Sequence, residues 1–101
     1  MILYSVTVNI DKDIEKEWLD WMKSIHIPDV LNTGMFVECK MYRILGEVDD
    51  GITYSFQYFS DSIANIDKYL QEHAPQLMQD HNARYKNKYV SHRTVLESVD
   101  L

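Results

Sequence analysis

The chain has 101 residues, of which 46% are hydrophobic and 26% charged, and its formal net charge is −6. This composition is typical of a globular protein and excludes an intrinsically disordered chain. The negative charge argues against binding to nucleic acid or to an anionic membrane surface. No apolar run approaches the ~20 residues of a membrane span. We therefore expect a single soluble domain over residues 1–101.

The single cysteine, Cys39, cannot form an internal disulfide, which suits a reducing compartment. The N-terminal residues 1–11 have neither the basic start nor the apolar run of a signal peptide. These two features predict a cytoplasmic location.

The first half of the chain predicts a strand, a helix and a short turn. Polar and apolar residues alternate over 1–10, as in a half-buried strand. A helix is expected to begin at Asp11, and its apolar residues recur at helical spacing: Ile14, Trp18, Trp21, Met22 and Ile25. Because Pro28 disfavours helical geometry at the residue before it, this helix is expected to end near His26. A short turn would follow, closed by Gly34 in a left-handed conformation.

The rest of the chain predicts three further strands and another helical region. Residues 35–45 are β-prone, 46–51 form a hairpin loop, and 52–59 form the next strand. Residues 60–62 offer N-cap side chains for a helix that Pro75 interrupts. A further helix would run from Pro75 to Tyr85, and residues 88–99 would form the last strand.

The resulting order, β-α-β-β-α-β, contains a weak internal repeat. Tyr4-Ser5-Val6 corresponds to Tyr54-Ser55-Phe56, and His26-Ile27-Pro28 corresponds to His73-Ala74-Pro75. Two similar halves joined by a hairpin predict the ferredoxin-like α+β fold. Right-handed crossovers would place the first and third strands at the centre of a four-stranded antiparallel sheet, with the helices on one face.

The uncovered face of this sheet predicts a dimer. Its centre would carry small polar side chains, namely Ser5, Thr7, Asn9, Thr53, Ser55 and Gln57, between largely apolar edge strands. These edges have few of the charges and prolines that protect natural edge strands. We therefore expect a homodimer that stacks the two sheets and encloses a small cavity, a dimeric α/β barrel. The alternative is a solvated face whose Ser and Thr reflect β-propensity alone.

Six residues are candidates for a site. His26, expected near the end of a helix and close to the sheet, is the best catalytic candidate, as a general base or haem ligand; alternatively, the helix dipole favours an imidazole there. The ligand-binding candidates are Asn9, Gln57, Arg43, Arg93 and His81. Asn9 and Gln57 would line the cavity between the sheets. Arg43 and Arg93 would bind a carboxylate or phosphate at its mouth, unless they form surface ion pairs.

His81 is either part of the site or a hydrogen-bonded core residue on an apolar helix face. No two histidines lie three or four residues apart, and Cys39 has no nearby ligand, so we expect no metal. We expect no cofactor either, because the sequence lacks a Gly-rich phosphate loop and a serine elbow.

Three segments carry a family resemblance: Trp18-Leu-Asp-Trp21-Met-Lys-Ser-Ile-His26-Ile-Pro28-Asp29-Val, Thr53-Tyr-Ser-Phe-Gln57-Tyr, and His73-Ala-Pro75 with His81-Asn-Ala-Arg84-Tyr85. Together they resemble a family of short bacterial proteins of unknown function in the dimeric α/β-barrel group. The resemblance implies a fold and a dimer, but no chemistry. The wider group includes cofactor-free monooxygenases, lactone isomerases and haem-degrading enzymes, whose activities would be analogies from the fold alone.

Three functions remain open, and whether the protein is an enzyme is open with them. The first is a small-molecule-binding or regulatory homodimer. The second is a cofactor-independent oxygenase or isomerase that uses His26 as a proton shuttle, close to Asn9 and Gln57. The third is a purely structural assembly subunit. The sequence does not fix which face of the second strand lines the cavity, and this decides where Arg43 points.

Overall fold

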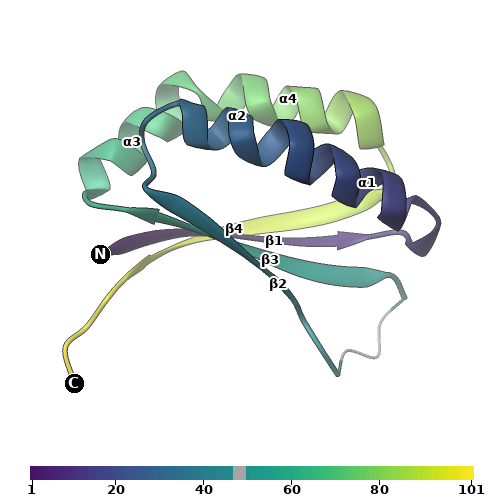
Figure 1. Cartoon of the computed structure of the whole chain (residues 1–101), viewed down its shortest axis with the longest axis horizontal. Coiled ribbons are helices and arrows are strands. Elements are labelled where there is room, and N and C mark those ends of the chain that lie inside the picture. The colour runs from purple at the N-terminus through teal and green to yellow at the C-terminus, as the bar shows by residue number, and fades with distance from the viewer. Residues whose placement is uncertain (47–49) are drawn as a thin grey trace.

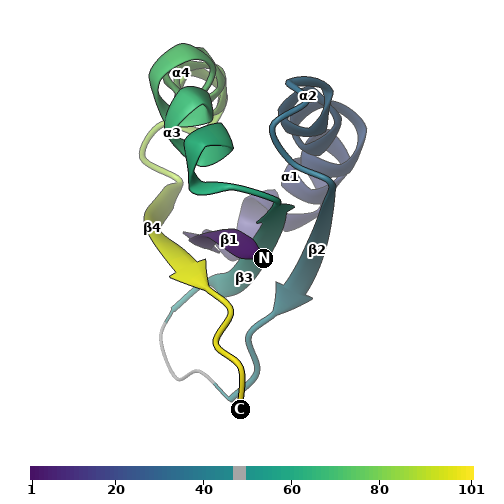
Figure 2. The same cartoon turned by 90° about the vertical axis from the view of Figure 1, so that its left-hand side faces the viewer.

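The structure is a computed structural model of the chain and describes residues 1–46 and 50–101. Its strands are β1 (Ile2–Ile10), β2 (Glu38–Arg43), β3 (Ile52–Ser60) and β4 (Tyr89–Glu97). They form one antiparallel sheet in the order β2-β3-β1-β4. The helices all cover the same face of it (Figures 1 and 2). This arrangement confirms the predicted ferredoxin-like fold, with β1 and β3 at the centre.

Alternation along β1 and β3 separates the two faces of the sheet. The even-numbered side chains point toward the helices and build the core, including Tyr4, Val8, Ile10, Tyr54, Phe56 and Tyr58, which are all buried. The odd-numbered side chains lie on the uncovered face, where Ser5 pairs with Gln57 and Asn9 pairs with Thr53. The sequence period of two therefore sorts core residues from the polar centre as predicted.

The first helical region is longer than predicted. A 3₁₀ turn (Lys12–Ile14), α1 (Glu15–Trp21), a π-helical segment (Met22–His26) and α2 (Ile27–Asn32) follow one another without a break. The prediction that the helix ends near His26 is therefore wrong. The Ile27 N–H donates to the Met22 carbonyl, five residues earlier. We attribute the tolerance of Pro28 to this wider turn, since a regular α-turn would press the proline ring against a carbonyl.

The ends of the other elements agree more closely with the sequence. Gly34 has a φ of 80° after α2, as predicted for a helix C-terminus. The helix α3 (Ile63–Glu72) begins at Ser62, whose Oγ accepts the Asn65 N–H at 3.2 Å. The helix α4 (Ala74–Tyr85) has its proline at the N-terminus, as predicted.

The edge strands are shorter than predicted. Regular pairing in β2 begins at Glu38 rather than at residue 35, and β4 covers Tyr89–Glu97 rather than 88–99. Before β2, the Met35 carbonyl accepts the Ser60 hydroxyl at 3.1 Å and the Val37 N–H donates to the Phe59 carbonyl at 2.8 Å, so single hydrogen bonds join this segment to β3 ahead of the regular ladder. Part of the predicted hairpin loop, residues 47–49, lies outside the described residues. Within 1–46 and 50–101, no helix is long and apolar enough to cross a membrane.

Candidate functional site

A cavity lies between the helices and the sheet. Its volume is about 50 Å³, counted as the space open to the centre of a water molecule. The side chains around it come from β1, β3, β4 and the helices, and most are apolar or aromatic. Three of its polar side chains were candidates from the sequence: His26, His81 and Arg93. The fold thus brings together residues from the π-helical segment, α4 and β4.

His81 is held by a hydrogen bond to the first helical region. The Trp18 indole Nε1–H donates to His81 Nε2 at 2.9 Å, and both side chains are buried. A neutral imidazole that accepts at Nε2 carries its proton on Nδ1. Burial lowers the pKa of His81 to about 4, and the electrostatic effects of neighbouring His26 and Arg93 act in the same direction. His81 is therefore neutral at pH 7, with its tautomer set by Trp18.

His26 lies beside His81, with 5.8 Å between their ring centroids. It is the last residue of the π-helical segment, and its ring packs against Trp21 at 5.3 Å. Burial lowers the pKa of His26, while Asp29 and Asp80 raise it and Arg93 lowers it again. The wider π-turn places this imidazole, and π-turns are frequent at functional sites. The helix-end explanation of His26 no longer applies, because the helix continues past it.

Arg93 reaches the cavity from the sheet. It pairs in register with Val6, so it lies on the helix-facing side of β4. Burial raises the pKa of the Tyr4 phenol, and the Arg93 guanidinium acts in the opposite direction. Among the described residues, the ion pairs involve Arg43, Arg84 and Lys88 but not Arg93. Arg93 therefore presents a charge that no described carboxylate neutralises at contact distance.

Tyrosines and one serine, Ser91, add further polar groups to the wall of the cavity. Tyr4, Tyr58 and Tyr69 line the cavity, and burial raises the pKa of each phenol. They are thus neutral groups that can donate or accept a hydrogen bond. Sequence reasoning did not assign them to a site, because tyrosines on the apolar side of a strand (Tyr4, Tyr58) or of a helix (Tyr69) are most simply explained as core residues.

Asn9 and Gln57 lie on the opposite face of the sheet. Asn9 Nδ2 donates to Thr53 Oγ1 at 2.9 Å, while Gln57 Nε2 donates to Ser5 Oγ at 2.9 Å and to Ser55 Oγ at 2.6 Å. The prediction that His26 lies close to Asn9 and Gln57 is therefore wrong. Strand alternation separates them, since the cavity at His26 is on the helix side. A cavity enclosed by two stacked sheets, with Asn9 and Gln57 in its wall, stays a prediction.

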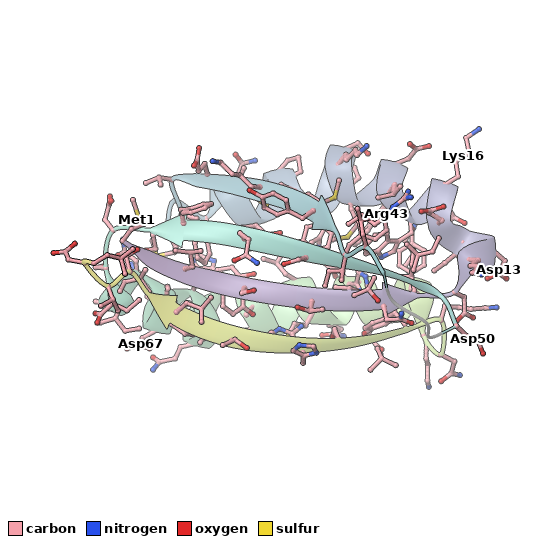
Figure 3. The ribbon with its side chains drawn as sticks, turned by 90° about the horizontal axis from the view of Figure 1, so that it is seen from below. Met1, Asp13, Lys16, Arg43, Asp50 and Asp67 are labelled. Carbon is pink, nitrogen blue, oxygen red and sulfur yellow. The ribbon has the colours of Figure 1, made fainter. Side chains whose placement is uncertain are left out.

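Arg43 takes part in a cluster at the β2 edge. It pairs in register with Tyr54 and so faces the helices, which answers the open question of strand parity. Its Nη2 lies 3.2 Å from Glu15 Oε2, and the same oxygen accepts the Tyr54 hydroxyl at 2.6 Å. Figure 3 shows Arg43 beside the first helical region. The structure thus places Arg43 in an ion pair and not among the described residues that line the cavity.

The described part of the chain offers neither a metal site nor a reactive thiol. No group of three or more His, Cys, Asp or Glu side chains there could hold a metal ion. Burial raises the pKa of the Cys39 thiol to about 11, so its nucleophilic thiolate form is scarce at pH 7. The described residues around the cavity supply one cation, two neutral imidazoles, four phenols and the Ser91 hydroxyl among otherwise apolar side chains.

Solved structures with this fold carry diverse functions. A dimeric ferredoxin-like protein from an uncultured marine organism matches with a TM-score of 0.71 and 13% identity, covering 100% of this chain and 97% of that one. A hydroxynitrile lyase from Passiflora edulis matches at 0.63 and 15% identity, over 99% and 97% of the two chains. An antibiotic biosynthesis monooxygenase matches at 0.64 and 13%, over 99% and 100%. At these identities the likeness establishes the fold alone.

The sequence itself leads to one family. No curated protein matches the chain. A family described as "Domain of unknown function (DUF4286)" matches residues 1–99. The chain therefore belongs to this family, as its resemblance to short proteins of unknown function predicted.

Proposed function

We propose that the protein binds a small organic molecule in the cavity between its helices and its sheet. The observation that carries the proposal is the convergence of His26, His81 and Arg93 on one cavity. Each comes from a different element, and the rest of the wall is largely apolar. A few polar groups in an apolar hollow are typical of ligand sites.

A homodimer is part of this proposal. The uncovered face of the sheet exposes large apolar side chains at its edges: Tyr42 (53% exposed), Val90 (73%) and Leu96 (44%). Exposed apolar groups on a sheet face mark an interface when they form a patch. A structural neighbour is itself a dimeric ferredoxin-like protein. Two copies of this single domain, stacked through their sheets, would leave the helix-side cavity of each copy intact.

A thermal-shift screen of small metabolites tests the binding proposal, with two serine variants as its control. Ser91 lines the cavity from β4, whereas Ser98 is exposed just beyond the strand. A ligand that raises the melting temperature of the wild type should not stabilise Ser91→Phe, because the new ring fills the cavity. It should still stabilise Ser98→Phe. If no metabolite stabilises the wild type, or if both variants respond equally, the cavity does not bind the ligand and a purely structural subunit is favoured.

A second candidate function is a cofactor-independent oxygenase or isomerase with His26 as proton shuttle. The observation that favours it is the lowered pKa of His26 inside the cavity, which keeps the imidazole available as a base at pH 7. Neighbours with the same fold include a monooxygenase and a lyase. Once a substrate is found, His26→Ala should lose about 10²–10⁴-fold in kcat. Full activity of that variant would remove His26 from the mechanism.

A further inference from the structure

We propose that the ligand of this cavity is a small organic anion, a monocarboxylate on a flat apolar body, whose carboxylate is bound by Arg93. This inference rests on the proposed binding function and specifies the chemical class of the ligand. It follows from the charge, the hydrogen-bond donors and the size of the cavity.

The charge of the cavity favours an anion although the protein as a whole is acidic. Among the described residues that line it, Arg93 carries the permanent charge and none is Asp or Glu. The described ion pairs do not include Arg93, and the partner that its guanidinium does have is the neutral Tyr4 phenol, so its charge and its remaining N–H donors can bind a ligand carboxylate. Asp29 and Asp80 are the carboxylates nearest in effect, and they act on His26. Neither of them is among the described residues that line the cavity.

The hydrogen-bond donors around the cavity also favour a carboxylate ligand. Trp18 occupies the acceptor nitrogen of His81, so the group that His81 can offer a ligand is the Nδ1–H donor. The hydroxyls of Tyr4 and Tyr69 are neutral and can also donate. A carboxylate accepts several such bonds, whereas an ammonium ligand would meet the charge of Arg93 and a histidine whose acceptor is already used. Trp18 thereby acts as a positioning residue for His81.

The size of the cavity limits the ligand to about one ring. Since a water needs ~10–15 Å³ of such space, about 50 Å³ holds roughly three to five waters. At about 30 Å³ of liquid volume each, these waters correspond to a molecule of about 100–150 Å³, and a 150 Å³ apolar cavity is known to bind benzene. The aromatic and apolar wall suits a ring body, with the carboxylate toward the exposed Arg93.

Three ring compounds of nearly equal size and different charge test the inference: benzoate, benzamide and benzylammonium. Affinities at pH 7 would be measured by titration followed in ¹H–¹⁵N NMR spectra, which also report where the compound binds. Benzoate should bind in the cavity at least about tenfold more tightly than benzamide, and benzylammonium should be weakest. Arg93→Gln should lower the benzoate affinity to the level of benzamide. The matched control is Arg84→Gln, which removes an arginine that pairs with Glu17 outside the cavity and should leave the benzoate affinity unchanged.

Each contrary outcome overturns the inference. Equal binding of benzamide or benzylammonium would show that charge does not select the ligand. Benzoate binding that survives Arg93→Gln would remove the arginine from the site. If none of the three probes binds in the cavity, the anion inference also fails, and the Ser91→Phe comparison then decides separately whether the cavity binds any ligand.

Discussion

Trp18 and His81 are joined by a buried hydrogen bond of 2.9 Å although 63 residues separate them in the chain. The bond connects α1 to α4 beside the cavity, and Trp18 is completely buried. This hydrogen bond has two effects: it holds the two helices together, and it fixes the tautomer of His81, whose side chain lines the cavity.

The substitution Trp18→Phe should therefore be costly. It removes the donor to His81 Nε2 and part of a buried ring, and we expect the free energy of unfolding to fall by about 2–4 kcal/mol. Urea unfolding at pH 7 measures this. The control is Trp21→Phe, which replaces the half-buried indole that packs on His26 by a smaller ring. Its free energy of unfolding should fall by about 1 kcal/mol. Equal losses in the two variants would contradict a stabilising role for the hydrogen bond.

The pH dependence of stability should carry the signature of His81. Its pKa is about 4 in the folded protein, against an ordinary value of 6.5 in the unfolded chain, and His26 and Arg93 are the charged groups that add to the effect of burial. Between pH 6.5 and pH 4, the unfolded chain binds a proton that the folded protein does not, so stability is lost as the pH falls through this window. The loss from His81 should approach about 3 kcal/mol.

This contribution can be isolated by comparing two histidine variants. His81→Gln retains an acceptor for Trp18 but does not titrate, so its stability should fall less between pH 7 and pH 4.5 than that of the wild type. His73→Gln changes a histidine at the junction of α3 and α4, outside both the cavity and the uncovered face of the sheet, and should follow the wild-type profile. Parallel profiles for all three proteins would mean that His81 does not titrate differently in the folded and unfolded states.

Sequence pattern predicted those features of the fold that depend on short-range periodicity. The alternation at Tyr4, Val8 and Ile10 set the buried face of β1, and Ser62 and Gly34 set helix ends by their local chemistry. The π-helical segment was missed, because Pro28 ordinarily ends a helix and nothing local signals the wider turn that accommodates it.

The site was predicted only in part, for a related reason. His26, His81 and Arg93 were each candidates, but their meeting point depends on how the helices pack over the sheet. Asn9 and Gln57 were assigned to the same place as His26, since a sequence gives the parity of a strand but not which face holds a cavity. The pairing of Trp18 with His81 is a long-range contact for which the sequence holds no signal.

Gly51 should be intolerant of any side chain. It has a φ of 91°, and a Cβ there would lie 2.6 Å from the Ile10 carbonyl oxygen and 2.7 Å from Asn9 Oδ1. Gly34 has a similar φ of 80° but nothing within 4 Å of its Cβ position. Gly34→Ala should therefore cost about 1–2 kcal/mol for the left-handed backbone alone. Gly51→Ala should cost about 1–3 kcal/mol more, because a backbone carbonyl cannot easily move away. Similar unfolding free energies for the two variants would contradict the close approach.

The uncovered face of the sheet should hold the dimer together. Val90 and Leu96 lie on this face, because they pair with Asn9 and Leu3 in register. Replacing both by glutamate would bury two charges between stacked sheets, and we expect the protein to become a monomer in native mass spectrometry. The control replaces Ile25 and Ile63 by glutamate; these are also exposed, at 47% and 51%, but lie on helical segments. That variant should remain a dimer. A monomeric wild type would refute the homodimer itself, whereas a dimer that survives Val90→Glu with Leu96→Glu would place its interface elsewhere.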